Sequence, residues 1–164
     1  MVNGLFLTDA QSAKIERHLI HLHSRAQAIC TLLADISGQL ISAVGTAPGT
    51  DSVPLAALAA SNMAATAEMA RLAGEPDSFS YLFHEGKERN IYITAVGDAF
   101  LLVILFDHSS QIGWVRLLAK EAALKLLEVV DGIQEAEELP GTVVDTDFGE
   151  TLANQLDQAF EAWD

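Results

Sequence analysis

Residues 55–75, LAALAASNMAATAEMARLAGE, form an alanine-rich stretch that predicts a helix with almost no bulk along one side. Ala56, Ala60 and Ala64 recur at a spacing of four and therefore share one stripe of that helix. Larger apolar side chains fall on another face, which we expect to pack into the protein's own core: Leu55, Leu58, Met69 and Leu72. Small side chains let a second backbone or a flat surface come close, so the stripe indicates contact with a partner. Helix propensity alone would also explain so much alanine, and the stripe by itself leaves both interpretations open.

Composition limits the class of protein. The chain has 164 residues, half of them hydrophobic, which suits one domain with a sizeable core. Its formal net charge is −14. Nucleic acid and anionic membranes attract basic surfaces, so we expect neither as a partner. A basic protein surface would suit this chain better.

Targeting signals and disulfides are not expected. Cys30 is the only cysteine and lies in an apolar run typical of a buried strand, so no internal disulfide can form. Asp9, Lys14 and Glu16 interrupt any early apolar run of the kind found in signal peptides. The apolar run at 99–106 is too short to cross a bilayer. We therefore expect a soluble, cytoplasmic protein.

Periodicity and turn residues predict an alternation of helices and short strands. Helices are expected over 9–26, after a cap at Thr8-Asp9, over 52–73, capped at Asp51 or Ser52 and closed by Gly74, and over 111–130. The expected strands are 28–35, 39–44, 79–86, 90–96 and 99–107, the last of them apolar on both faces as a central strand would be. Short turns allow antiparallel neighbours. The fold class is therefore predicted as α/β of the α+β type, a five-stranded antiparallel sheet with helices on both faces, plus a C-terminal amphipathic helix.

The domain boundaries follow from composition. We expect a domain at 1–132, an acidic linker at 133–147 and an amphipathic helix at 148–164. The last segment has apolar residues at helical spacing, typical of a docking helix rather than a buried one: Leu152, Leu156, Phe160 and Trp163.

Sequence motifs for catalysis are missing. Lys87 is followed by Glu88 and not by Ser or Thr, so there is no P-loop, and no G-x-G-x-x-G or G-x-S-x-G stands in the chain. His18, His21 and His23 could in principle bind a metal, but polar residues on a surface helix are the simpler interpretation. The pair His84-Glu85 is explained as well by a strand end as by catalysis. We expect no catalytic residue, no cofactor and no metal site.

Several segments in this order resemble the Roadblock (dynein light-chain type) family, and within it the bacterial MglB-like proteins. They are LLADISGQLISAVG, the alanine-rich helix, FHEGKERNIYITAVG, and LLVILFD followed by IGWVRL, which together cover about residues 28–130. The resemblance implies a homodimer in which the helix at 52–73 pairs with its mate and the strand at 79–87 extends the sheet into the second copy. It also implies that two subunits bind one Ras-like small GTPase of the MglA type and activate it in cell polarity or motility.

Such regulators are understood to supply no arginine finger and to reposition the GTPase's own residues. By position in the motif, Ala60 and Ala64 would face the GTPase, and both belong to the methyl stripe. The resulting partner-binding set is Ala56, Ala60, Met63, Ala64, Ala67 and Arg71. Three functions remain open: an activator of a GTPase, a Roadblock scaffold that dimerises without changing the rate of any GTPase, and an enzyme with its own active site. The missing motifs count against the enzyme.

Overall fold

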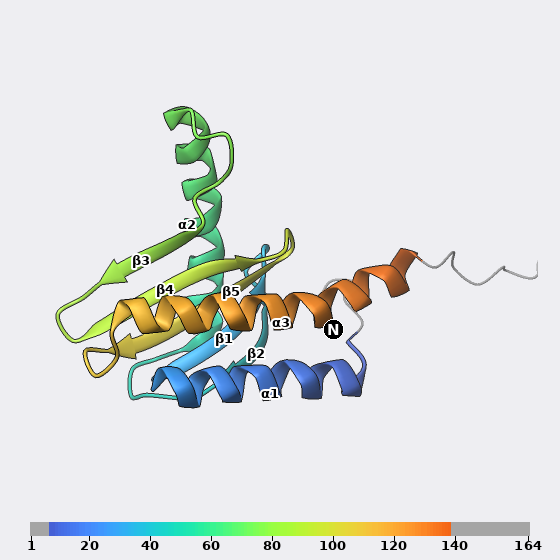
Figure 1. Ribbon diagram of the computed structural model, residues 1–164, viewed down its shortest axis with the longest axis horizontal. Helices are drawn as coiled ribbons and strands as arrows, with labels where there is room; N and C mark the ends of the chain where they lie inside the picture. Colours follow the sequence, from blue (N-terminus) through green and yellow to red (C-terminus); the bar gives the residue numbers. More distant parts are fainter. Residues whose placement is uncertain (1–6, 139–164) are drawn as a thin grey trace, which may run out of the picture. The chain divides into compact units, whose positions relative to one another are not determined.

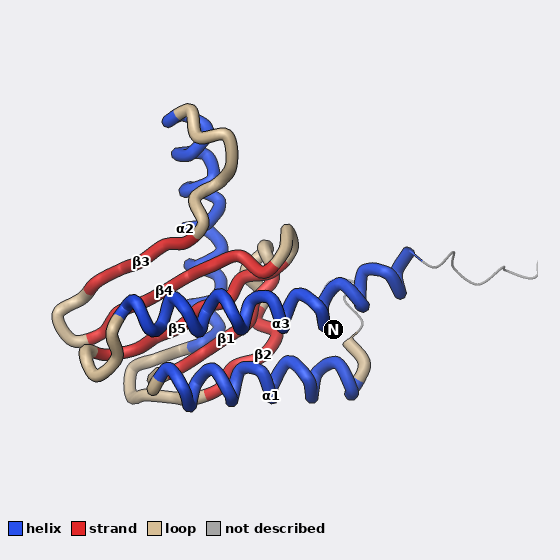
Figure 2. The backbone as a smooth tube through the Cα atoms, viewed as in Figure 1, coloured by secondary structure: helices blue, strands red, loops and turns tan. Residues whose placement is uncertain are grey.

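The computed structural model describes the backbone of residues 7–138 and the side chains of residues 7–131. Five strands form one antiparallel sheet in the order β2-β1-β5-β4-β3, as Figures 1 and 2 show. The strands are β1 (Cys30–Asp35), β2 (Leu40–Val44), β3 (Tyr81–Glu85), β4 (Arg89–Val96) and β5 (Phe100–Asp107). The helices are α1 (Asp9–Ala26), α2 (Ser52–Ala73) and α3 (Ile112–Glu138). The predicted five-stranded antiparallel sheet with helices on both faces is confirmed.

Helix ends follow the expected capping residues. Thr8 and Gln11 form a capping box at the start of α1. The Asp51 carboxylate accepts a hydrogen bond from the Val53 backbone N–H at 3.2 Å and begins α2. Gly74 ends α2 in the left-handed conformation that glycine adopts without strain. The sequence therefore sets both ends of the alanine-rich helix locally.

Strand β5 is the middle of the sheet. It pairs with β1 on one side and β4 on the other, and every residue from Phe100 to Phe106 is buried. Val103 and Leu105 of β5 pack with Ala56 and Ala59 of α2. The alternate side chains point to the opposite face of the sheet, where Figure 1 shows α1 and α3. A strand covered on both faces needs apolar residues at every position, which explains the run AFLLVILF.

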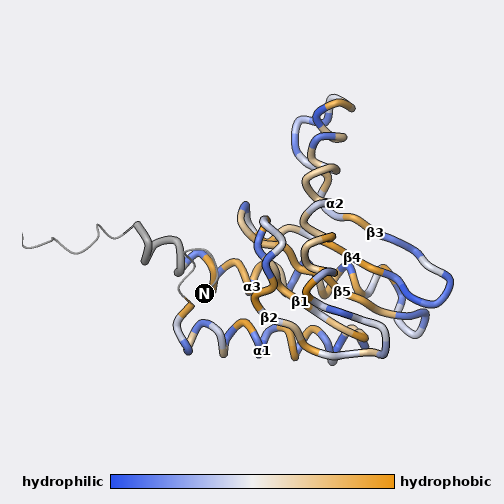
Figure 3. The backbone as a smooth tube through the Cα atoms, turned by 180° about the vertical axis from the view of Figure 1, so that it is seen from behind, coloured by the Kyte–Doolittle hydropathy of each residue, from blue (hydrophilic) through white to orange (hydrophobic). Residues whose placement is uncertain are grey.

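Helices α1 and α3 cover the face opposite α2. Buried Ile15, Leu19 and Leu22 recur along α1, where polar and apolar residues alternate (Figure 3). Two buried hydroxyls tie this layer together. The Thr31 Oγ1 donates to the Leu19 carbonyl at 3.2 Å, and the Ser110 hydroxyl donates to the Ala26 carbonyl at 2.5 Å.

Helix α3 is longer than the periodicity predicts. It continues past the expected end at Val130 to Glu138, into the stretch expected to be acidic linker. Gln, Glu and Ala favour helix there, and the first proline comes only at Pro140. The four residues predicted to form the docking stripe lie outside the described residues: Leu152, Leu156, Phe160 and Trp163. Among the helices that are described, none is long and apolar enough to cross a bilayer.

Candidate partner-binding surface

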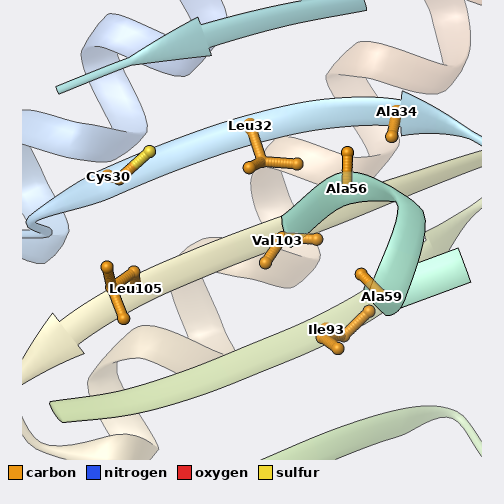
Figure 4. Packing of buried hydrophobic residues seen from close by; sticks show 8 residues of the cluster. All are labelled: Cys30, Leu32, Ala34, Ala56, Ala59, Ile93, Val103 and Leu105. Carbon is orange, nitrogen blue, oxygen red and sulfur yellow. The ribbon is translucent and has the colours of Figure 1, made fainter. Parts of the chain in front are cut away.

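The inner side of α2 is lined by alanine. Ala56 and Ala59 pack with Leu32, Ile93 and Val103 in the cluster that Figure 4 shows. Ala56 is 0 % exposed, and Ala60 is 6 % exposed. The prediction that the whole methyl stripe lies open to a partner is therefore wrong for these two residues, because the flat surface that comes close to them is the protein's own sheet.

Helix α2 lies unusually near the β1–β2 hairpin, and this explains the choice of alanine. A Cβ on Gly38, in the hairpin turn, would lie 2.7 Å from the Cα of Ala57. Larger residues on the inner side of α2 would push the helix away from the sheet and open a void. The small residues thus serve contact within the chain over the first half of the helix.

The outer side of α2 carries large apolar side chains. Leu58, Met69 and Leu72 are 63 %, 62 % and 72 % exposed. Our prediction that they belong to the core is wrong, since the alanines occupy that place. Their spacing is visible in the sequence, but it does not say which of two apolar faces meets the sheet. Large apolar side chains that are this exposed favour contact with another protein.

The remaining residues of the predicted partner-binding set are accessible in the described chain. Ala64, Ala67 and Arg71 are exposed, and Met63 is half-buried against the core cluster. Leu55, also expected in the core, is partly buried there. The structure thus keeps the second half of the methyl stripe on the surface, next to the large apolar side chains.

A concave surface adjoins α2 on the same face of the sheet. Two neighbouring hollows, of 410 and 260 Å³, lie between α2 and β4. Leu55, Leu58 and Ile91 line both of them. Arg89 borders the larger hollow and donates to the Thr50 hydroxyl at 3.1 Å, which holds the loop before α2 against the strand. The α2 face therefore offers both a ridge and a groove to a partner.

Strand β3 forms one edge of the sheet. It pairs only with β4 among the described strands, from Tyr81 opposite Thr94 to Glu85 opposite Asn90. Its outer side presents backbone groups that can accept another strand. Figure 1 shows that the connection from α2 to β3 runs back beside the second half of α2. The free edge and the exposed part of α2 are thus neighbours.

An arginine finger would need a free guanidinium, but Arg71 and Arg116 both make contacts within the chain. The Arg71 guanidinium donates two hydrogen bonds to the Glu68 carboxylate, at 2.6 and 2.9 Å, and these bonds lower the pKa of Glu68. The Arg116 guanidinium carbon lies 4.7 Å from the ring centroid of Tyr81, on the α3 side of the sheet. Arg116 therefore lies on the face opposite α2.

The residues considered for metal binding do not form a set of three ligands in the described part of the chain. His18 and His21 line a small pocket with Arg25 and Lys125, and burial together with nearby cations lowers the pKa of His18. The buried Cys30 thiol lies 3.9 Å from the Ser52 hydroxyl, and burial raises its pKa.

The family model described as Roadblock/LC7 domain matches residues 14–106. MglB from Myxococcus xanthus is 36% identical, with 79% of this chain and 96% of that chain covered and a TM-score of 0.72. The gliding protein MglB from Thermus thermophilus is 30% identical over 79% of this chain and 97% of that chain, with a TM-score of 0.73. No curated protein sequence matches the chain significantly.

More distant similarity shows the fold alone. A Roadblock/LC7 domain from Streptomyces avermitilis is 15% identical, covers 74% of this chain and 95% of that chain, and has a TM-score of 0.56. The family match spans more than half of the chain, and the two MglB structures align over nearly their whole length. The chain therefore belongs to the Roadblock/LC7 family and is MglB-like within it.

Proposed function

We propose that this protein is a homodimeric regulator that binds a Ras-like small GTPase of the MglA type in the cytoplasm and stimulates its GTP hydrolysis, in cell polarity or motility. One observation carries the proposal: an MglB-like chain leaves a ridge of apolar side chains on α2 exposed beside a concave surface and a free strand edge. A monomer would leave that apolar area in water, which favours association.

The dimer is proposed to form along β3 and α2. Antiparallel pairing of two β3 strands would satisfy the outward backbone groups of both and join two sheets into one. Met69 and Leu72, near the end of α2 and exposed in the single chain, would be covered by the second copy's helix. A solved structure described as MglB with tetrameric arrangement is 29% identical over 79% of this chain. This similarity supports self-association of the present chain.

The GTPase is proposed to sit on the middle of α2. Ala64 and Ala67 are small and exposed, so a flat partner surface can approach the helix backbone there. Met63 and Leu58 border the same area, and Leu58 leads into the hollows above β4. Ala56 and Ala60 support this surface from below by packing on the sheet and do not touch the partner.

Activation is proposed to work by positioning. Arg71 is held in a bidentate pair with Glu68, and Arg116 lies on the other face of the sheet, so neither is placed to act as a finger. Holding a GTPase loop so that its own residues orient the attacking water can still lower the barrier by several kcal/mol. The protein would then have no active site of its own.

A scaffold that binds the GTPase without changing its rate uses the same surface. The two functions are separated by measuring single-turnover GTP hydrolysis by a Ras-like partner with and without this protein. The proposal expects acceleration that Ala64→Arg abolishes, while Ala13→Arg, at an exposed alanine on α1, leaves it unchanged. Binding without acceleration would support the scaffold, and a monomer mass in light scattering at micromolar concentration would contradict the dimer.

A further inference from the structure

A second concave surface lies on the face opposite α2. A cavity of 390 Å³ opens between the first half of α3 and strands β3 and β4. The α3 side chains that line it recur at helical spacing and so share one face of the helix: Arg116, Lys120, Ala123 and Leu127. We call this hollow the α3 cavity.

The α3 cavity has an aromatic, cationic end and an apolar end. At the first, the rings of Tyr81 and Tyr92 stack with centroids 5.1 Å apart, and the Arg116 guanidinium carbon lies 4.7 Å from the Tyr81 centroid. At the other, a Cβ added to Gly97 would lie 2.7 Å from the Leu127 Cδ1. Gly97 and Leu127 both line the cavity, so their close contact bounds it at the apolar end. A compact molecule therefore suits the cavity better than a chain that runs through it.

Tyr92 supplies a hydroxyl that has no partner. The residue is 4 % exposed, and its hydroxyl forms no hydrogen bond with any described residue. Among those residues, no side-chain nitrogen or oxygen that is closed off from solvent lacks a hydrogen bond. The Tyr92 hydroxyl is therefore open, and the α3 cavity is the hollow that this side chain lines. Burial raises the pKa of Tyr92 and outweighs the opposing effect of Arg116, so the hydroxyl keeps its proton and can donate it to a ligand.

Two cations at the same end are available to an anion. Arg116 and Lys120 are exposed, and the ion pairs within the described residues involve Arg25, Arg71 and Lys125 but neither of these two. A guanidinium that lies over a ring still offers the N–H donors in its own plane. The formal net charge of the chain is −14, so these local cations, and not the field of the whole protein, must attract an anion.

We propose that the α3 cavity binds a small carboxylate with a compact apolar body. The carboxylate accepts hydrogen bonds from Arg116, Lys120 and the Tyr92 hydroxyl, and the body packs toward Val96 and Leu127. Ligand pockets usually combine such a volume, about 300–1,000 Å³, with apolar walls and a few converging polar groups that fix the orientation of the ligand. All of these residues belong to one chain and lie opposite α2. The site therefore needs neither the GTPase nor a second copy, and it goes beyond the proposed function.

The test is a titration of the isotopically labelled full-length protein by nuclear magnetic resonance. Cinnamate should bind at least about tenfold tighter than cinnamamide, which has nearly the same shape but no charge, because hydrogen bonds to charged groups are the stronger ones. Octanoate distinguishes an aliphatic body from an aromatic one, and acetate has no such body. Tighter binding of cinnamate or octanoate than of acetate supports the proposal, whereas equal binding of all three would overturn it.

Substitutions locate the binding site. Tyr92→Phe removes only the hydroxyl and should weaken cinnamate binding by about tenfold. Arg116→Gln with Lys120→Gln should reduce the affinity for cinnamate to that for cinnamamide, whereas Lys14→Gln with Arg17→Gln, at exposed cations of α1, should leave the preference intact. Absence of cinnamate binding, equal affinities for acid and amide, or a preference that survives the changes at the cavity would overturn the proposal. Thermal melts verify that each variant folds, and the two glutamine changes at the cavity decide the matter even if Tyr92→Phe does not.

Discussion

The turn residue Gly38 lies against the helix residue Ala57, so close that a Cβ on Gly38 would come within 2.7 Å of the Ala57 Cα. Gly38 also has a φ of +90°, which other residues rarely adopt. The β1–β2 hairpin and α2 are thus joined by a contact that only glycine permits. The position of α2 on the sheet, and with it the surface that α2 exposes, depends on this contact.

Replacing Gly38 by Ala should destabilise the protein by about 2–4 kcal/mol, because backbone strain and a clash with α2 act together. Gly49→Ala is the matched control. Gly49 has a φ of +75° but no atom within 4 Å of its added Cβ, so only the strain of about 1 kcal/mol should remain. Urea unfolding of both variants measures the difference, and equal losses would refute a close contact at Gly38.

Arginine at two successive positions of the methyl stripe should affect different properties, folding stability at Ala60 and partner binding at Ala64. Ala60→Arg forces a charge into the interface between α2 and the sheet, which should cost about 3 kcal/mol or more of folding free energy. Ala64→Arg lies on the surface and should change stability by less than about 0.5 kcal/mol while removing GTPase binding. Thermal melts measure the loss of stability, and titration calorimetry measures the affinity for the GTPase. If the folded Ala64→Arg variant still bound the GTPase, Ala64 would not belong to the binding surface.

Neither Arg71→Ala nor Arg116→Ala should reduce the stimulated rate of GTP hydrolysis by more than about twofold at saturating protein. Removing a true arginine finger costs about 10³–10⁵ in rate, so the two outcomes cannot be confused. Single-turnover hydrolysis is the measurement. A large loss of rate with unchanged affinity in either variant would show that this protein supplies a catalytic group.

Stability should rise with pH through the range in which His18 loses its proton. Burial and the nearby Lys125, Arg17 and His21 lower the pKa of His18 in the folded protein, and Glu128 opposes them. The unfolded chain then binds more protons, so folding is favoured as pH increases up to about 6.5. His18→Gln should flatten this part of the pH profile in urea unfolding. If the variant kept the same slope of unfolding free energy against pH, the pH dependence would belong to other titratable groups.

Local signals in the sequence are sufficient to predict most of the fold. The caps at Thr8 and Asp51, the stop at Gly74 and the doubly apolar run of β5 each act over a few residues, so they can be read without tertiary information. The predicted end of α3 is too early because Gly132 and nearby acids suggest a linker, whereas a single glycine among helix-favouring residues costs only about 1 kcal/mol.

The orientation of α2 could not be deduced in the same way. The helix has methyl groups on one side and large apolar groups on another, and the hydrophobic effect alone places the larger residues inside. The close approach to Gly38 reverses that preference, and it depends on residues nearly twenty positions apart. For the same reason, the contact between Arg116 and Tyr81 could not be foreseen, since the two residues meet only in the folded chain.

The central place of β5 bears on how the protein is made. Its neighbours β1 and β4 do not pair with each other, so the two halves of the sheet cannot join until Phe100–Asp107 has left the ribosome. Until then, the β1–β2 and β3–β4 hairpins expose apolar faces with nothing between them. A nascent chain stalled just before residue 100 should therefore recruit chaperones, whereas one extended beyond α3 should be released from them.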